Sequence, residues 1–525
     1  MRAALASIPA RLFWISWILF SVHFATNIVR EHYPAFSLIE RGDFILDDYV
    51  GFHADIFVHT DGHAYVGNQV AGSLPAVIPL LYFKPVLDAL QAYSLRRLAE
   101  GGAPEASYRT DRPNRAAFFR EVRRRGLALR FGAASVATSV FLMAPLSAAF
   151  VAWMFLILRR RGVAEGRATL LALLFGFGTP VFYRTAHLNH NMFLMMVIFG
   201  SFWLLWPQSD PARQAAPPRA ARRVAWAGLL AGTGVALDYA GVVPLLALYA
   251  TLLLRRWPTA GFRRAFLESL PFVAGSVPPV LFLLWSQWDM YGNPFLPGQF
   301  HMPAVNYTDR GWRGMSWPSF GVFWRNLMDP AWGLYPFAPL LLLGLIPARL
   351  QRGGARLLPR PERRFVVAFG LAFLTFCAAN QYSLMQWNTG FRYLLPLVPF
   401  LFLQVAEVLQ RVSSRVFAAL AIPAVAHTWV LSMARYTQPT LTASSPAPVV
   451  ESWRRILTQG PELPWLTVLR QITPDPHSFV HWAVWPWLIL ALAFGLCAVL
   501  WTVGEGAARR ARSGAAASVL AQGCR

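Results

Sequence analysis

Long apolar runs separated by short basic connections make up most of the chain. An α-helix needs roughly 20 residues to cross about 30 Å of hydrocarbon, and the shorter runs reach that length when flanking residues are included. Runs of this kind lie near residues 12–29, 131–158, 168–184, 190–206, 224–236, 240–254, 270–286, 331–349, 365–379, 393–409, 416–433 and 479–502. The pattern predicts an all-α polytopic membrane protein with about 12 transmembrane helices, within a range of about 11–13.

Arginine clusters between the apolar runs set the predicted orientation. They lie at 159–161, 213–223, 255–264, 349–364, 411–415 and 509–510. All six fall on one side if the N-terminus is cytoplasmic, and cytoplasmic connections are enriched in Lys and Arg. We therefore expect a multi-pass protein of the plasma (inner) membrane with both termini in the cytoplasm. The run 74–93 would invert this order if it spanned, so we expect an interfacial or re-entrant helix there.

Composition and charge agree with this class. Only 14% of residues are charged and 56% are hydrophobic, whereas soluble proteins carry about 25% charged residues. The formal charge of +23 comes from arginines clustered between apolar runs, which is typical of a topology signal rather than a nucleic-acid-binding face. The three cysteines have no paired spacing. We therefore expect no nucleic-acid partner, no disulfide and no structural zinc.

The pattern also divides the chain into three parts. Residues 1–409 form a transmembrane module with a long first outer loop at about 30–130. Residues 410–504 add C-terminal transmembrane helices with an outer loop at 434–478, and the basic segment 505–525 has the composition of a disordered cytoplasmic tail. Polar chemistry concentrates in the outer stretches, so we expect the functional site there.

The first outer loop holds the densest set of ionisable residues, namely Glu40, Asp43, Asp47, Asp48, His53, Asp55, His59, Asp61 and His63. A carboxylate just outside a membrane can act as a general base on an acceptor hydroxyl or amine, and Asp47 and Asp48 suit that role. Adjacent carboxylates repel each other, which raises one pKa toward working pH when they are partly desolvated. The alternatives are solvated loop residues or a weak Asp/His metal site. Because no DxD spacing appears, we predict no metal site.

Further polar residues mark the predicted outer ends of spans, where burial is costly. Arg184, His187 and His190 form one group, and Asp238 and Tyr239 form another. Asp238 either lines a cavity or pairs with an arginine such as Arg184 for helix packing.

Arg392 opens an apolar span at the predicted outer surface. There its guanidinium could clamp a phosphate or diphosphate with two parallel hydrogen bonds, or extend to lipid headgroups. Both interpretations place it at the interface.

Six short motifs occur in a characteristic order. They are Glu40-Arg41-Gly42-Asp43-Phe44-Ile45-Leu46-Asp47-Asp48-Tyr49; Asp61-Gly62-His63-Ala64-Tyr65 leading to Ala71-Gly72-Ser73-Leu74-Pro75; Phe177-Gly178-Thr179-Pro180-Val181-Phe182-Tyr183; Tyr291-Gly292-Asn293-Pro294-Phe295; Gly333-Leu334-Tyr335-Pro336; and Gly390-Phe391-Arg392-Tyr393-Leu394-Leu395-Pro396. From Leu12 to about Val405 the chain resembles the GT-C superfamily of polyprenyl-phosphate-sugar glycosyltransferases. The resemblance is strongest to bacterial relatives of protein O-mannosyltransferases and of the lipid A aminoarabinose transferase.

The resemblance implies inverting transfer of a hexosyl or pentosyl group from a polyprenyl-phosphate donor to a glycan, lipid or protein acceptor on the extracytoplasmic side. It implies no cofactor, and a divalent metal is not required. An aspartate of the first outer loop is needed in such enzymes, which maps onto Asp47 or Asp48, with Asp55 as the second candidate.

The chain departs from the family where relatives often carry a phosphate-contacting lysine, because residues 66–70 read Val-Gly-Asn-Gln-Val. Phosphate binding then falls to Arg392, Arg184 or the loop arginines, or catalysis is lost. The expected substrate-binding set is Tyr65, Asn68, Gln69, Arg184, His187, His190, Asp238, Tyr239 and Arg392.

Two other functions fit part of the pattern. A polytopic transporter or flippase for a lipid-linked or anionic substrate would also need a cationic cavity, and a non-catalytic homologue would keep the fold alone. The long acidic outer loop and the lack of recognisable inverted repeats favour the enzyme. We therefore expect a lipid-linked sugar donor, an acceptor and membrane lipids as the partners.

Overall fold

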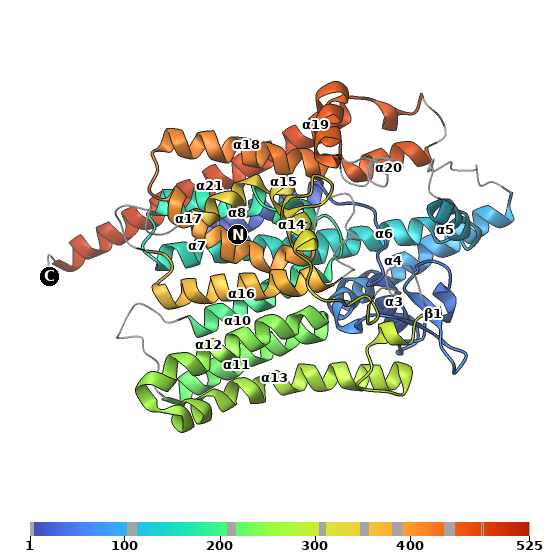
Figure 1. Ribbon diagram of the computed structural model, residues 1–525. Helices are drawn as coiled ribbons and strands as arrows, with labels where there is room; N and C mark the ends of the chain where they lie inside the picture. The colour runs from blue at the N-terminus through green and yellow to red at the C-terminus, as the bar shows by residue number, and fades with distance from the viewer. Residues whose placement is uncertain are drawn as a thin grey trace.

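Long helices form a bundle, and short helices with one β-hairpin cover one end of it (Figure 1). This computed structural model describes residues 5–101, 113–206, 217–303, 311–346, 356–380, 392–434, 447–473, 475 and 477–523. The bundle helices are α2 (Ile8–Val22), α6 (Ala128–Thr138), η3 (Ser139–Met143), α7 (Ala144–Arg160), α8 (Glu165–Phe177), α9 (Val181–Arg184), α10 (His190–Leu205), α11 (Pro217–Leu237), η5 (Tyr239–Gly241), α12 (Val242–Ala260), α13 (Phe262–Tyr291), α16 (Arg360–Ala379), η10 (Arg392–Leu397), α17 (Val398–Leu409), α18 (Ser414–Met433) and α21 (Trp485–Gly523).

The prediction of an all-α polytopic membrane protein is confirmed. Among the described residues, six helices are long and apolar enough to cross a membrane: Ala128–Arg160, Tyr239–Ala260, Phe262–Tyr291, Arg392–Leu409, Ser414–Met433 and Trp485–Arg510. The helices α2 and α10 are apolar but shorter. The only paired strands in the described ranges are β1 (Ile56–Val58) and β2 (Ala64–Val66), which form an antiparallel hairpin.

Three predicted segments can be compared directly with the structure. The run 331–349 is not one spanning helix, because Gly333, Pro336 and Pro339 divide its described part into α15 (Leu334–Phe337) and η7 (Pro339–Leu345). The run 74–93, expected to be an interfacial or re-entrant helix, forms one continuous helix, α4 (Leu74–Ala99). The segment 505–523, expected to be disordered, continues α21, in keeping with its many alanines.

Small residues bring α11 and α13 into close contact. Gly228 and Gly232 of α11 face the backbone of Phe272 and Ser276 on α13, so that a Cβ at either glycine would collide with it. Glycines four residues apart allow two helix backbones to approach closely in a membrane. This contact orients the end of α11, where Asp238 and η5 follow.

The arginine clusters gather at one end of the molecule, which we call the basic end. Figure 1 places the end of α7, the α12–α13 turn and the α17–α18 turn together on the left. Arg255 pairs with Glu362, and the Nη2 atom of Arg363 lies 2.7 Å from Glu407 Oε2. These three described clusters therefore share one end of the molecule.

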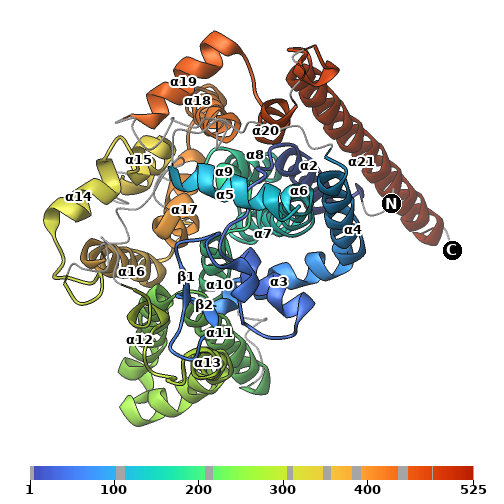
Figure 2. The same cartoon turned by 90° about the vertical axis from the view of Figure 1, so that its right-hand side faces the viewer.

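The opposite end, which we call the hairpin end, carries the short elements together with the longer helix α4. They are α3 (His32–Glu40), η1 (Asp47–Tyr49), β1, β2, η2 (Val70–Gly72), α4, α5 (Pro113–Arg124), η6 (Gly298–Phe300), α14 (Phe320–Met328), α15, α19 (Pro448–Gln459), α20 (Pro464–Ile472) and η11 (Phe479–His481) (Figures 1 and 2). Phe36 of α3 stacks on Phe131 of α6 with ring centroids 5.7 Å apart, and Tyr33 and Phe52 pack around this pair. The first loop is thereby anchored on the bundle.

Candidate functional site

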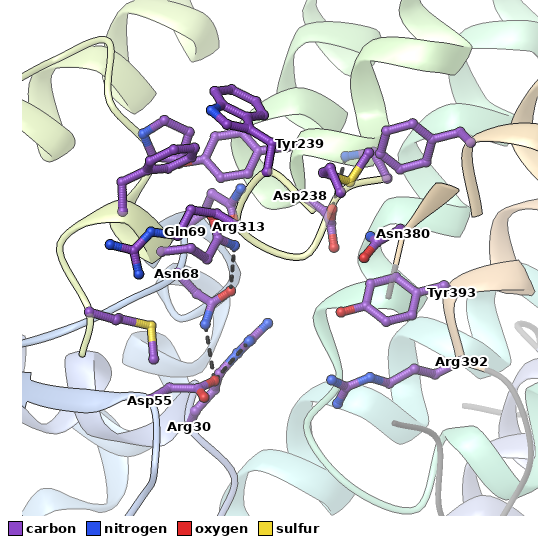
Figure 3. A pocket seen from close by; sticks show the side chains of 18 residues that line it. Arg30, Asp55, Asn68, Gln69, Asp238, Tyr239, Arg313, Asn380, Arg392 and Tyr393 are labelled. Atoms are coloured by element: carbon purple, nitrogen blue, oxygen red, sulfur yellow. Dashed lines mark hydrogen bonds and ion pairs between the residues drawn. The ribbon is translucent and has the colours of Figure 1, made fainter. Parts of the chain in front are cut away.

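A polar pocket of about 230 Å³ lies at the hairpin end, between the first loop and the bundle. Its walls combine residues that are far apart in the sequence, namely Arg30, Asp55, Asn68, Gln69, Asp238, Tyr239, Ala240, Pro297, Gln299, Phe300, Met302, Trp312, Arg313, Met315, Phe376, Asn380, Arg392 and Tyr393 (Figure 3). Six of the residues predicted from sequence line it: Asp55, Asn68, Gln69, Asp238, Tyr239 and Arg392.

The β-hairpin places Asp55 and Asn68 side by side. Asp55 immediately precedes β1 and Asn68 follows β2, and the register pairs Ile56 with Val66. The backbone N–H of Gly67 donates to the carbonyl of Asp55 over 2.8 Å, and Asn68 Nδ2 donates to Asp55 Oδ2 over 3.0 Å. The carboxylate is thus held by the hairpin geometry itself.

Arg30 holds the other side of the Asp55 carboxylate. Its Nη1 atom lies 3.1 Å from Asp55 Oδ2, and its Nε atom lies 3.3 Å from Glu31 Oε1. Burial alone would raise the pKa of Asp55, but the charges of His53 and Arg30 outweigh it and hold that pKa below its ordinary value. Asp55 is therefore ionised at neutral pH.

A second buried network connects the loop to the bundle. The Nδ1 atom of His190 lies 2.5 Å from Glu31 Oε1, and its Nε2 atom lies 3.3 Å from Asp238 Oδ2. The other oxygen of Asp238 accepts from Ala240 N over 2.9 Å, which caps η5. Asp238 is therefore both paired and on the cavity wall, and its partner is His190 rather than Arg184.

Arg392 and Tyr393 come from η10 and face Asp55 across the pocket, with Asn380 from the end of α16 beside them (Figure 3). The guanidinium of Arg392 lies 5.5 Å from the ring centroid of Tyr393. The charge of Arg392 also contributes to the lowered pKa of Asp55. Arg30 and Arg392 therefore lie on opposite walls of the pocket, and the Asp55 carboxylate lies beside Arg30.

The upper rim carries Gln69 and Arg313 (Figure 3). Within the described ranges, the buried Nε2 donor of Gln69 has no hydrogen-bond partner. Arg313 adopts a left-handed backbone with φ 49°, in the tight turn that joins Trp312 to Met315. Buried unpaired donors and left-handed residues of this kind concentrate at binding sites.

Asp47 and Asp48 lie outside the pocket, which corrects their expected placement. Asp47 accepts from the backbone N–H of Ala64 over 2.7 Å and lies 2.9 Å from His63 Nδ1, so it fastens η1 to β2. Its slight burial raises the pKa, but these two hydrogen bonds lower it overall, opposite to the increase expected for adjacent carboxylates. The Asp48 side chain is 70% exposed, beside Arg41.

The remaining predicted residues are also placed away from the pocket lining. Tyr65 is buried in the hairpin, and its hydroxyl donates to Asp61 Oδ2 over 3.0 Å. Arg184 and His187 are buried near α9, and His190 reaches the pocket only through Asp238 and Arg30.

Twelve of the eighteen lining residues were not predicted, among them the polar residues Arg30, Gln299, Arg313, Asn380 and Tyr393. Arg30 directly follows the first apolar run, and Tyr393 directly follows Arg392. Their positions at the ends of predicted spans could therefore have identified them as candidate site residues. Gly390 and Phe391 of the last sequence motif lie outside the described residues. No cluster of three or more His, Cys, Asp or Glu side chains in the described part of the chain could hold a metal ion.

The sequence matches no family model and no curated protein. The structure is similar to the apo crystal structure of ArnT from Cupriavidus metallidurans, over 95% of this chain and 76% of that chain. The TM-score is 0.47 and the sequence identity is 15%. At this level of similarity the likeness assigns neither activity nor substrate. What is established is a polytopic, all-α membrane protein with a charged pocket at its hairpin end.

Proposed function

We propose that the protein is a membrane glycosyltransferase of the GT-C type, which moves a sugar from a polyprenyl-phosphate donor to an acceptor at the hairpin end. One observation supports this most strongly: Asp55 and Arg392 face the same cavity. A carboxylate and a guanidinium across one small cavity match the two ends of the reaction, namely the acceptor that loses a proton and the phosphate that leaves.

Asp55 is the general base in this proposal. Its carboxylate is ionised and held by Arg30 and Asn68. It accepts the proton of an acceptor hydroxyl or amine as that group attacks the anomeric carbon. The bond from the anomeric carbon to the phosphate oxygen breaks on the opposite face, so the configuration inverts and polyprenyl phosphate leaves. The sugar can be a hexose or a pentose, since the pocket lining specifies neither.

Arg392 and Arg313 receive the phosphate in this proposal. Guanidinium groups bind phosphate oxygens through charge-assisted, paired hydrogen bonds. The unpaired Nε2 donor of Gln69 supplies a further contact where relatives carry a lysine. Because the leaving group is already a phosphate held by cations, the proposal includes no metal ion.

The membrane orientation follows from the charge pattern. The arginines at the end of α7, in the α12–α13 turn and in the α17–α18 turn lie at the basic end, and the pocket lies at the other. The positive-inside rule then places both termini in the cytoplasm and the pocket at the extracytoplasmic surface, where a lipid tail stays in the bilayer and its phosphate meets the site. The acceptor is a glycan, lipid or protein that reaches this surface.

The test is transfer of a radiolabelled sugar by the purified full-length protein in proteoliposomes. A series of labelled polyprenyl-phosphate sugars is offered with a membrane or cell-wall fraction as acceptor. Asp55→Asn should lower the rate by at least about 100-fold, the usual contribution of a general base. Asp47→Asn is the matched control, since it changes a carboxylate of the same loop outside the pocket, and it should keep the rate within about threefold, a change near 0.6 kcal/mol.

Three results would overturn the proposal. The first is that the folded wild-type protein transfers sugar from none of the donors. The second is that Asp55→Asn and Asp47→Asn lose activity equally, which would show that transfer does not depend on the pocket. The third is that intact labelled donor crosses the vesicle membrane without transfer, which is the behaviour of a flippase.

A further inference from the structure

A second polar cavity lies at the basic end, where α21 packs against α2 and α8. It has a volume of about 520 Å³ and lies at the opposite end of the bundle from the pocket described above. Its charged walls are Arg11 from α2, Glu165 from α8, and Glu505 and Arg509 from α21. Figure 2 shows α21 at the edge of the bundle.

Arg11 is the central residue of this cavity. It is only 5% exposed, yet its Nε and Nη1 atoms make no hydrogen bond to any residue in the described ranges. Its nearest carboxylate oxygen, on Glu505, is 3.9 Å away, and its guanidinium lies 4.5 Å from the ring centroid of Trp501. A buried guanidinium with so few hydrogen bonds is costly unless an acceptor is supplied.

Gly504 makes room for this side chain. A Cβ at position 504 would collide with the Cδ atom of Arg11 and the carbonyl of Leu5. The absence of a side chain on α21 therefore lets the stem of Arg11 pass between the two helices. The cavity is a built feature of the α2–α21 contact and not a gap at a loose surface.

Glu165 and Arg509 are exposed on the walls of the cavity, and Glu505 Oε1 accepts from Trp501 Nε1 over 2.9 Å. Neither the Glu165 carboxylate nor the Arg509 guanidinium forms an ion pair or side-chain hydrogen bond with any residue the structure describes. Two cations and two carboxylates line one space, so their charges match a ligand that carries both signs. An anion alone would contact the two arginines but neither of the two carboxylates.

The surroundings indicate a lipid as the source of such a ligand. Ile8 and Leu170 line the same cavity, and the Leu170 side chain is 48% exposed. On α21, Leu492 and Val499 are 73% and 56% exposed, as expected for a helix that faces acyl chains. The cavity thus joins a charged space to an apolar helix surface, which is the profile of a phospholipid headgroup above its chains.

We propose that this cavity binds the headgroup of a membrane aminophospholipid such as phosphatidylethanolamine. Arg11 and Arg509 hold its phosphate, and Glu165 and Glu505 accept hydrogen bonds from its primary ammonium. A choline headgroup has no N–H to donate, and an anionic headgroup has no cation for the carboxylates. The bound lipid links α2, α8 and α21, and so holds the peripheral helix against the bundle.

Native mass spectrometry of the full-length protein tests this site. The protein is reconstituted in nanodiscs of equimolar phosphatidylethanolamine, phosphatidylcholine and phosphatidylglycerol, then released into mild detergent, and the retained lipids are counted. Wild-type protein should retain phosphatidylethanolamine in preference to both others. Arg11→Gln and Glu165→Gln should each lower that preference about tenfold, the effect of losing one charge-assisted hydrogen bond.

Arg510→Gln is the control, because Arg510 neighbours Arg509 on α21 and its Nε atom donates to the carbonyl of Gly506. It should retain the lipid as wild type does. Glu165→Gln keeps the test decisive if Arg11→Gln fails to fold. Equal retention of the three lipids, or equal behaviour of Glu165→Gln and Arg510→Gln, would overturn the proposal. Displacement by an excess of soluble glycerophosphoethanolamine would overturn the membrane lipid as the source.

Discussion

Arg30 bridges two carboxylates in a buried position, and its loss should destabilise the protein strongly. Its side chain is 14% exposed, and those of Asp55 and Glu31 are 15% and 8% exposed. Charges about 4 Å apart interact by about 4 kcal/mol at an effective dielectric constant near 20. Removing one partner of a buried pair typically costs about 3–5 kcal/mol, since a charge is left uncompensated. We expect Arg30→Met to lower the free energy of unfolding by that amount.

The same reasoning predicts coupling between Arg30 and Asp55. Asp55→Asn removes one of the uncompensated charges, so the double variant should be more stable than the sum of the single changes by about 1–3 kcal/mol. Unfolding in detergent micelles, followed by tryptophan fluorescence, measures all three variants. Arg41→Met is the control, because Arg41 pairs with Asp43 and Asp48 at the surface and should cost about 0.2–1 kcal/mol.

Two results would refute this account of Arg30. The effects of Arg30→Met and Asp55→Asn may add to within about 0.5 kcal/mol, which is the behaviour of independent sites. Alternatively, Arg30→Met may cost no more than Arg41→Met, which would show that burial of the pair has no energetic consequence.

Three further predictions concern the transfer reaction. The pKa of Asp55 lies below its ordinary value of about 3.9, so in a pH–rate profile the transfer rate should stay level above about pH 5 and fall only in acid. Arg30→Met removes a cation that lowers this pKa, so the fall in rate should move to higher pH. Arg392→Lys keeps the charge but loses the paired hydrogen bonds, so it should raise the KM for the donor about tenfold in steady-state kinetics, and an unchanged KM would contradict the phosphate contact. Arg313→Gly should weaken donor binding in a titration without lowering the melting temperature, since glycine adopts φ 49° without the roughly 1 kcal/mol strain of a side chain, and a lowered melting temperature would contradict it.

The fold was largely predictable because hydrophobic runs and arginine clusters report directly on membrane burial and topology. The exception at 331–349 shows the limit of hydropathy. That run is apolar throughout, but Gly333, Pro336 and Pro339 remove backbone hydrogen bonds or favour breaks, so its described part divides into short turns. The conformational preferences of these three residues therefore end the helix, and the hydropathy of the run does not reveal such a break.

The site was predictable in type but not in every residue. Asp47 and Asp55 are both loop aspartates, and only the register of β1 and β2 turns Asp55 inward beside Asn68 while Asp47 caps the hairpin from outside. Arg30 is positioned by Asp55, which lies 25 residues away in the sequence. His190 is positioned by Asp238, which lies 48 residues away. Such long-range pairing is a property of the folded chain and leaves no local pattern.

The position of the donor phosphate tests the central claim most directly. A cryo-electron microscopy structure of the full-length protein with a non-hydrolysable polyprenyl-phosphonate sugar would locate it. Our account predicts the phosphonate within hydrogen-bond distance of Arg392 and the anomeric carbon facing Asp55, inside the pocket at the hairpin end. A phosphonate bound at the basic end, or in the pocket with its sugar directed away from Asp55, would contradict it.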